Sequence, residues 1–208
     1  MKNIKLFERE LSLIVDEDLR MAVKAYLLDP DYVPDYFWID GASSSGKYHP
    51  KMSQGIGGLV RHTKAVVMFA EELLRMSSYA YMKEEYKDYV IAACIIHDTV
   101  KYGWDAEINK DEYKNHAGNA ASAFEEFCQN YTEVVPHYLL LQAVRSHMGQ
   151  WSTNKEDRPF TNIDRCVHMA DYMADYMASR SFIDIPSIAE EYNEIACQWA
   201  VENHELPF

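Results

Sequence analysis

Apolar residues recur along the chain at helical spacing, and no segment shows the strict alternation of apolar and polar residues that is typical of a β-strand. From Leu11 to Leu28 apolar side chains return every three or four residues, which predicts an amphipathic helix that ends before Pro30. Further helices are predicted over residues 59–76, 83–98, 116–130, 136–148, 162–179 and 186–203. The predicted fold class is therefore all-α, a helical bundle.

The length of 208 residues and the apolar share of 48% predict a single domain over residues 1–208 with a core at about 55–180. An N-terminal helix and loop (1–54) and a C-terminal helix (186–203) are expected to flank this core. Between residues 40 and 58 the composition changes to Gly, Ser, Pro and Lys, and a loop of this length indicates a role beyond connecting two helices.

The start of the chain mixes charges with its apolar residues and lacks the apolar core of a signal peptide. No apolar run approaches the roughly 20 residues that a membrane-spanning helix needs. We therefore expect a soluble, cytoplasmic protein with no membrane partner. The four cysteines form no CxxC pair and are expected to be reduced thiols: Cys94, Cys128, Cys166 and Cys197.

The net charge of −13 disfavours long nucleic acid as a substrate, because proteins that hold a nucleic-acid backbone normally present an excess of Lys and Arg to the phosphates. A local basic rim within this acidic surface is conceivable from Lys47, Lys51, Arg61, Lys64 and Lys101. For Lys51 and Lys64, ordinary solvated charges are the better interpretation.

Candidate metal chemistry begins at His97 and Asp98, which end the strongly apolar run 89–96 and are followed by Lys101. An imidazole and a carboxylate are costly to bury side by side unless something pairs them, and a divalent metal ion pairs both. A helix cap beside an Asp98–Lys101 ion pair is the simpler alternative. Further metal-ligating residues recur along the chain: His62, His116, His147 and Asp171.

In order and spacing, these motifs resemble the HD-domain superfamily of metal-dependent phosphohydrolases. The resemblance covers roughly residues 55–180. It comprises GGLxxHT at 57–63, the apolar run into HDxxK at 97–101, His-Ala-Gly at 116–118, Ser-His-x-Gly at 146–149 and HxxD at 168–171. Each motif is weak alone, and the ordered set is specific.

The resemblance implies one or two divalent transition-metal ions (Fe, Mn, Co or Ni, with Mg as a further option) and no organic cofactor. The first ion would be held by His62, His97, Asp98 and Asp171. The second would be held by His116 and His147, with Asp98 bridging the two. Asp98 and Lys101 are the candidate catalytic residues, and Lys101 would orient the attacking hydroxide or hold a phosphate oxygen if the helix continues that far.

Met148 departs from one family pattern. Cyclic-dinucleotide phosphodiesterases of this superfamily carry a His-His pair at this place, and a thioether does not replace an imidazole toward a hard or borderline metal ion. Those enzymes are therefore poorer models, and the second metal site is expected to be weaker. Single histidines still suffice for two ions in the diiron HD hydrolases of dinucleoside polyphosphates.

Substrate contacts are expected from two places. By resemblance to the HD-containing 3′–5′ exoribonucleases, which carry a histidine-bearing segment before GGLxxHT, the candidates are Lys47, Tyr48 and His49; a surface turn is the alternative for this loop. A polar stripe on one helical face is predicted to point into a cleft, and it consists of Asp164, His168, Asp171 and Asp175. Arg180, beyond this stripe, is a third candidate contact, with pairing to an acid as the alternative.

The leading functional interpretation is a metal-dependent phosphohydrolase that cleaves a phosphomonoester or phosphodiester of a nucleotide or similar small molecule through a metal-activated hydroxide. One alternative is a 3′–5′ nuclease on single-stranded nucleic acid. Another is a diiron oxygenase, because inositol and organophosphonate oxygenases use the same ligand set on an HD-type core. A third class of function, a regulatory module without catalytic activity, ranks below the hydrolase and the oxygenase, since the ligand set is complete. The Tyr and Met residues of the last two helices fit either a homodimer face or core packing.

Overall fold

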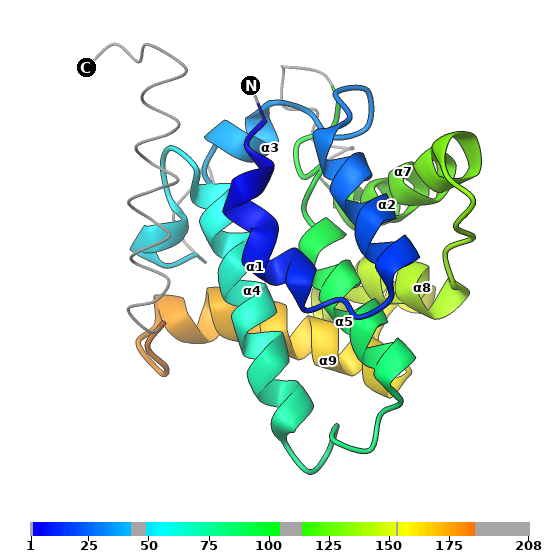
Figure 1. The fold of residues 1–208 in the computed structure, drawn as a ribbon. Coiled ribbons are helices and arrows are strands. Elements are labelled where there is room, and N and C mark those ends of the chain that lie inside the picture. The colour runs from blue at the N-terminus through cyan, green and yellow to red at the C-terminus, as the bar shows by residue number, and fades with distance from the viewer. Residues whose placement is uncertain (1, 43–48, 105–113, 153, 186–208) are drawn as a thin grey trace.

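The computed structural model describes residues 2–42, 49–104, 114–152 and 154–185. Within these ranges every regular element is a helix and no β-strand is present, which confirms the predicted all-α class (Figure 1). The C-terminal helix expected at 186–203 lies outside the described residues, as do Lys47, Tyr48 and Cys197.

In chain order the elements are the 3-10 helix η1 (Ile4–Phe7), α1 (Glu8–Ser12), α2 (Glu17–Leu28), α3 (Tyr36–Ile39), η2 (Lys51–Ser53), α4 (Gly58–Arg75), α5 (Glu84–Ile96), α7 (His116–Tyr131), α8 (Tyr138–Ser146), η3 (Gly149–Trp151), η4 (Lys155–Asp157), α9 (Asn162–Tyr172) and the π-helix η5 (Met173–Met177). The predicted helices between residues 59 and 148 lie within two residues of α4, α5, α7 and α8. The predicted helix 162–179 corresponds to α9 and η5 together.

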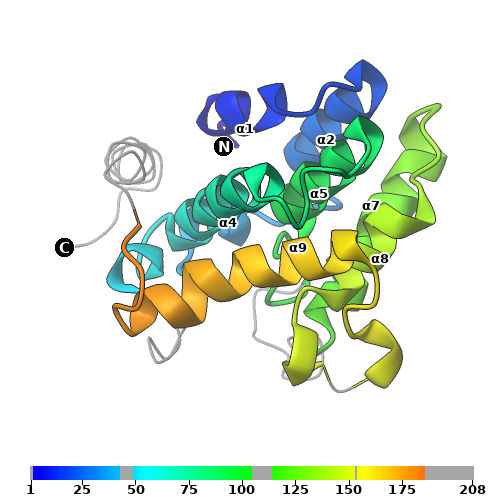
Figure 2. The same ribbon diagram turned by 90° about the horizontal axis from the view of Figure 1, so that it is seen from below.

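Helix α5 lies at the centre of the fold and contacts α1, α2, α4, α7, α8 and α9. Figure 2 shows α4 and α5 between the N-terminal helices on one side and α9 on the other. The side chains of residues 90–96 are at most 3% exposed, which explains why this second half of the helix is apolar on all faces. The end of α5, where His97 and Asp98 follow, is thereby placed inside the molecule.

The single helix predicted from Leu11 to Leu28 is wrong, because α1 and α2 are separate helices. Asp16 caps α2 by accepting a hydrogen bond from the backbone N–H of Leu19 at 3.0 Å. The buried carboxylate of Asp88, on α5, accepts the N–H groups of Val15 and Asp16 at 2.9 and 2.8 Å. These bonds satisfy the backbone where the helix is interrupted and tie it to the core.

The loop before α4 is held against the start of that helix. Gly57 has a φ of +67°, and a Cβ on Gly58 would overlap the carbonyl group of Ser53, so both positions require glycine. The buried guanidinium of Arg61 donates to three carbonyl oxygens between residues 52 and 56. Arg61 therefore holds this loop in place. It does not contribute to a basic rim at the surface, which the sequence had suggested.

Lys64 is buried as well, so neither the basic rim nor a solvated charge describes it. Its ammonium group pairs with the carboxylate of Glu10 at 2.6 Å and donates to the backbone carbonyl of Leu6. Burial lowers the pKa of Lys64, although Glu10 acts in the opposite sense. Lys64 therefore joins α4 to the N-terminal helices. Lys51, in contrast, is exposed as expected.

The remaining expectations from the sequence concern thiols and membranes. Cys94, Cys128 and Cys166 are buried free thiols, in agreement with the sequence analysis. Of the helices in the described ranges, none has the length and apolar character needed to cross a membrane.

Candidate metal centre

Six side chains that the sequence marks as metal ligands converge at one place, although they come from five helices. His62 lies on α4, His97 and Asp98 follow α5, His116 begins α7, His147 follows α8 and Asp171 lies on α9. The side chain of Asp171 is 14% exposed, and the other five are at most 3% exposed. The packing of α4, α5, α7, α8 and α9 thus assembles the cluster.

One half of the cluster consists of His62, His97, Asp98 and Asp171. The Nε2 atoms of His62 and His97 are 3.0 Å apart. Oδ2 of Asp98 lies 3.4 Å from Nε2 of His62 and 3.5 Å from Nε2 of His97. Oδ1 of Asp171 lies 3.3 Å from Nε2 of His62 and 3.9 Å from that of His97. Four potential ligand atoms therefore surround one point.

The other half uses the second carboxylate oxygen of Asp98. Oδ1 of Asp98 lies 3.3 Å from Nε2 of His116 and 3.7 Å from Nε2 of His147. The two imidazole nitrogens are 3.1 Å apart. Asp98 therefore stands between two histidine pairs and presents one oxygen to each, which is the arrangement expected of a bridging carboxylate.

The distances fit ligands arranged around metal ions. Two nitrogens that each lie about 2.1 Å from one ion are about 3.0 Å apart at a right angle and about 3.4 Å apart at a tetrahedral angle. The ring tautomers fit as well, because Nδ1 of His97 donates to the carbonyl of Cys94 at 2.7 Å and Nδ1 of His62 lies 3.0 Å from Oδ1 of Asp175. Although burial opposes it, Asp175, Asp171 and Asp98 raise the pKa of His62 well above its usual range, so this point favours a positive charge. With a proton on each Nδ1, a metal ion held by the two Nε2 atoms would supply that charge in place of a proton.

The charges in the cluster also favour a cation. Burial alone would raise the pKa of Asp98, but Lys101 and the surrounding histidines hold it well below its usual range. The pKa of Asp171 is likewise held below its usual range by His62 and His97, against the effect of burial. Burial, together with His97 and His116, lowers the pKa of His147 to about 3, so this imidazole stays neutral and able to bind a metal ion.

The comparison with known families agrees with this geometry. A family model described as HD domain matches residues 59–175, more than half of the chain. The chain belongs to the HD-domain family. Members of this family are in general metal-dependent phosphohydrolases. Neither a curated protein nor a solved structure matches the chain.

In this HD domain, Lys101 reaches the centre from a turn instead of a helix. Helix α5 ends at Ile96, so the condition that the helix continues as far as Lys101 is not met. The backbone N–H of Lys101 donates to the carbonyl of Asp98, and this turn brings the ammonium group onto Oδ2 of Asp98. Although burial opposes the charged form, Asp98 outweighs it and raises the pKa of Lys101, which stays protonated.

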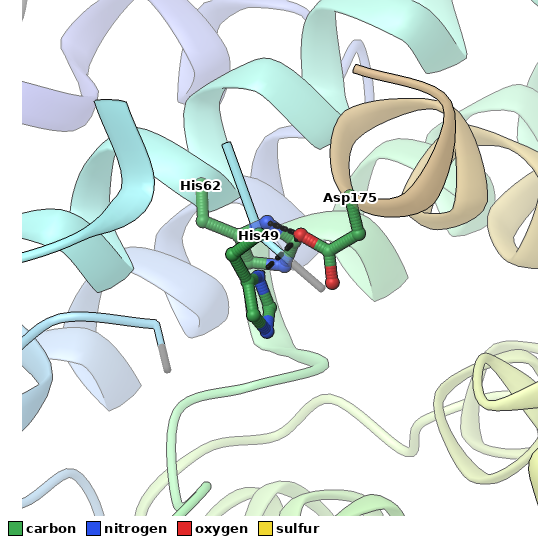
Figure 3. A group of neighbouring side chains, drawn as sticks. All are labelled: His49, His62 and Asp175. Atoms are coloured by element: carbon green, nitrogen blue, oxygen red, sulfur yellow. Dashed lines mark ion pairs between the residues drawn. The ribbon is translucent and has the colours of Figure 1, made fainter. Parts of the chain in front are cut away.

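Asp175 is a member of the site that the sequence analysis placed in the polar stripe but not among the candidate site residues. Figure 3 shows its carboxylate projecting toward the rings of His49 and His62. Oδ1 of Asp175 lies 2.5 Å from Nδ1 of His49 and 3.0 Å from Nδ1 of His62. Asp175 thus orients His62, and it places His49, a predicted substrate contact, beside the centre.

We expect Asp175→Ala to weaken metal binding by about tenfold to a hundredfold, because a carboxylate that orients a ligating imidazole and raises its basicity contributes by that amount. Competition with a chromophoric chelator measures the affinity. Asp184→Ala, at an exposed position outside the cluster, is the matched control and should bind as the natural protein does. Equal affinities of the two variants would contradict the role given to Asp175.

The other members of the predicted stripe have structural roles. Asp164 closes a capping box with Thr161 at the start of α9, so it does not point into a cleft. His168 donates from Nδ1 to the carbonyl of His147 at 2.7 Å and thereby supports this candidate ligand through its backbone. Gly149 has a φ of +57°, and a Cβ there would overlap the ring of His168. This contact explains the glycine two residues after His147.

A cavity of about 280 Å³ opens onto the centre. Its polar lining consists of His49, Asp98, Lys101, His116, His147, Asp171 and Asp175, and its apolar lining consists of Met148, Trp151, Tyr172 and Tyr176. Tyr172 and Tyr176 were expected at a dimer face or in the core, and Trp151 was not among the predicted site residues. Arg180 does not line the cavity. Its guanidinium carbon lies 3.6 Å from the centre of the Tyr176 ring, so it borders the cavity wall.

Proposed function

We propose that this HD domain is a phosphohydrolase that cleaves a phosphomonoester or phosphodiester of a nucleotide or similar small molecule at a centre of two divalent metal ions. The observation that carries the proposal is the position of Asp98, whose two oxygens face two separate histidine pairs. A carboxylate shared in this way is typical of two-metal hydrolytic sites. His62, His97, Asp98 and Asp171 would hold one ion, and His116, His147 and Asp98 the other.

Bound at this centre, divalent ions would lower the pKa of a water molecule from 15.7 toward about 7 and compensate negative charge on the phosphoryl oxygens. Lys101 supplies a further cation at the floor of the cavity. Its ammonium group contacts one oxygen of Asp98 and has donors left for a phosphoryl oxygen. Lys101 therefore binds and stabilises the phosphoryl group as it gains charge during hydrolysis, and it does not serve as a base.

A small substrate fits the size and the charge of the site better than a long nucleic acid does. The cavity of about 280 Å³ lies just below the range of about 300–1,000 Å³ that is usual for small-molecule pockets. Among the described cationic residues Lys101 lines it, whereas Arg61 and Lys64 serve the fold. The net charge of −13 opposes a polyanion. Lys47, outside the described residues, and Arg180 remain proposed contacts for phosphate at the rim.

An anaerobic assay distinguishes hydrolysis from oxygenation at this ligand set, because only oxygenation needs O₂. We expect the Mn²⁺-loaded protein to release product from a panel of nucleotide monoesters and diesters under anaerobic conditions, because hydrolysis needs only Lewis acidity. Chromatography of the products and an assay for inorganic phosphate measure this. Oxygen consumption tied to product formation, with no hydrolysis in its absence, would contradict the proposal and favour an oxygenase. If a long single-stranded nucleic acid is shortened faster than any small ester is hydrolysed, the result would favour a nuclease.

A further inference from the structure

Three aromatic rings line one wall of the cavity. Trp151 comes from η3, Tyr172 from the end of α9 and Tyr176 from η5. The planes of Tyr172 and Tyr176 are inclined by 14°, those of Trp151 and Tyr172 by 21°, and those of Trp151 and Tyr176 by 34°. The three rings therefore face in about the same direction.

The distances between the rings show a compact cluster and not a linear column. The centroids of Tyr172 and Tyr176 are 5.0 Å apart, those of Trp151 and Tyr172 are 5.6 Å apart, and those of Trp151 and Tyr176 are 6.3 Å apart. In a column the two outer rings would be about twice as far apart as neighbouring rings. Rings at these distances and angles are offset and partly overlap one another, and the three together form a compact aromatic cluster in the cavity wall, which we call the aromatic platform.

The platform lies beside the proposed metal ligands because of how the last helix is built. Tyr172 follows Asp171, and Tyr176 follows Asp175, so each ring lies one residue away from a carboxylate of the centre. The chain passes from α-helix to π-helix between these two pairs. Residues four apart are neighbours on a helical face, and π-helical turns occur frequently at functional sites.

The exposure of Trp151 in the platform is not explained by core packing. Trp151 is 48% exposed although it carries the largest apolar side chain in the cavity wall. Met148, one residue after the ligand His147, adds a further apolar side chain to the lining. An aromatic surface that opens into a cavity beside a cluster of acidic and basic groups has the composition of a small-molecule site, in which apolar walls bind the body of the ligand and polar groups orient it.

We propose that the aromatic platform of Trp151, Tyr172 and Tyr176 binds the planar base of a nucleotide whose phosphoryl group lies at the metal centre. This inference rests on the proposed function and specifies which part of the substrate each wall binds. Stacking on aromatic side chains tolerates every base, because each base has a π face. The guanidinium group of Arg180 stacks on Tyr176 and covers one face of that ring, so the contacts with the base are expected chiefly from Trp151 and Tyr172.

Binding of two matched ligands tests the platform without turnover. Both are phosphonates in which a methylene group replaces the ester oxygen, so neither is hydrolysed. One is the analogue of adenosine 5′-monophosphate and the other is the analogue of ribose 5-phosphate, which lacks the base. Calorimetric titration of the Mn²⁺-loaded protein should show the adenosine analogue binding about tenfold to a hundredfold more tightly. Equal affinities would overturn the proposal.

Variants assign the difference to the platform. Trp151→Leu and Tyr172→Leu should each weaken the adenosine analogue at least tenfold and the ribose analogue less than twofold, whereas Trp151→Phe, which keeps a ring, should retain most of the affinity. Phe160→Leu removes an aromatic ring that is 81% exposed and does not line the cavity, and it is the matched control. Equal losses for both ligands in Trp151→Leu and Tyr172→Leu would overturn the proposal.

The failure of this proposal and the failure of the proposed function give different results. If the protein hydrolyses ribose 5-phosphate as efficiently as adenosine 5′-monophosphate, the phosphohydrolase stands and the platform is not a base site. If the adenosine analogue binds through Trp151 but no ester is hydrolysed under any metal condition, the base site stands and the proposed hydrolysis is wrong.

Discussion

Asp98→Ala is expected to remove most of the bound metal from both halves of the centre and to lower kcat/KM by at least about a thousandfold. The reason is geometric, because the two oxygens of this one carboxylate face His62 and His97 on one side and His116 and His147 on the other. Loss of the ions removes several kcal/mol of transition-state stabilisation. The natural protein should retain between one and two equivalents of a transition metal.

Elemental analysis of the purified proteins measures the metal content, and initial rates on the best ester of the panel measure kcat/KM. Asp184→Ala, in which an exposed carboxylate is removed instead, is the control for a general effect of lost acidic charge. Thermal unfolding of both variants shows whether the fold survives. A folded Asp98→Ala protein with a full metal complement would contradict the bridging role.

The second large effect is expected for Lys101→Met, which keeps the apolar stem but removes the ammonium group beside Asp98. We expect kcat/KM to fall by about 10²–10³-fold, as for other preorganised groups that stabilise developing charge. Metal should be retained, because Lys101 neutralises Asp98 without being a ligand itself. Steady-state kinetics combined with elemental analysis separates these two properties. Loss of metal in proportion to activity would assign Lys101 to the assembly of the site and not to catalysis.

Lys64→Met is the matched control for Lys101→Met, because Lys64 is also a buried lysine paired with a carboxylate. Its partner Glu10 lies outside the cavity lining, so this variant should lose stability, by about 3–5 kcal/mol as for other buried pairs that lose one member. At a temperature where it remains folded, its metal content and kcat/KM should equal those of the natural protein. An effect on catalysis as large as that of Lys101→Met would show that any buried lysine matters equally.

The helices could be predicted from the sequence because their apolar periodicity is local. The interruption between α1 and α2 could not, since the carboxylate that satisfies the backbone there belongs to Asp88, far along the chain. The burial of Lys64 and Arg61 was missed for a similar reason. Their partners, Glu10 and the carbonyl groups of the loop before α4, become neighbours only when the chain is folded.

The convergence of the six predicted ligands could be anticipated from the order of the motifs, because each motif ends or begins a helix of one packed bundle. The roles of Asp175 and of the aromatic platform could not be read in the same way. Asp175 lies in a π-helical segment and contacts His49 and His62 from other parts of the chain, and Trp151 lies in a 3-10 turn after α8. The four-residue spacing between Asp171 and Asp175 was the one local signal for the role of Asp175.

Diffraction from crystals of the Mn²⁺-loaded protein, measured where manganese scatters anomalously, tests the central claim most directly. We predict two anomalous peaks roughly 3.5–4 Å apart, as in other two-metal sites. One should lie among His62, His97, Asp98 and Asp171, and the other beside His116 and His147, with the carboxylate of Asp98 between them. No peak among these six residues, or a single peak with Asp98 bound through one oxygen only, would contradict the account.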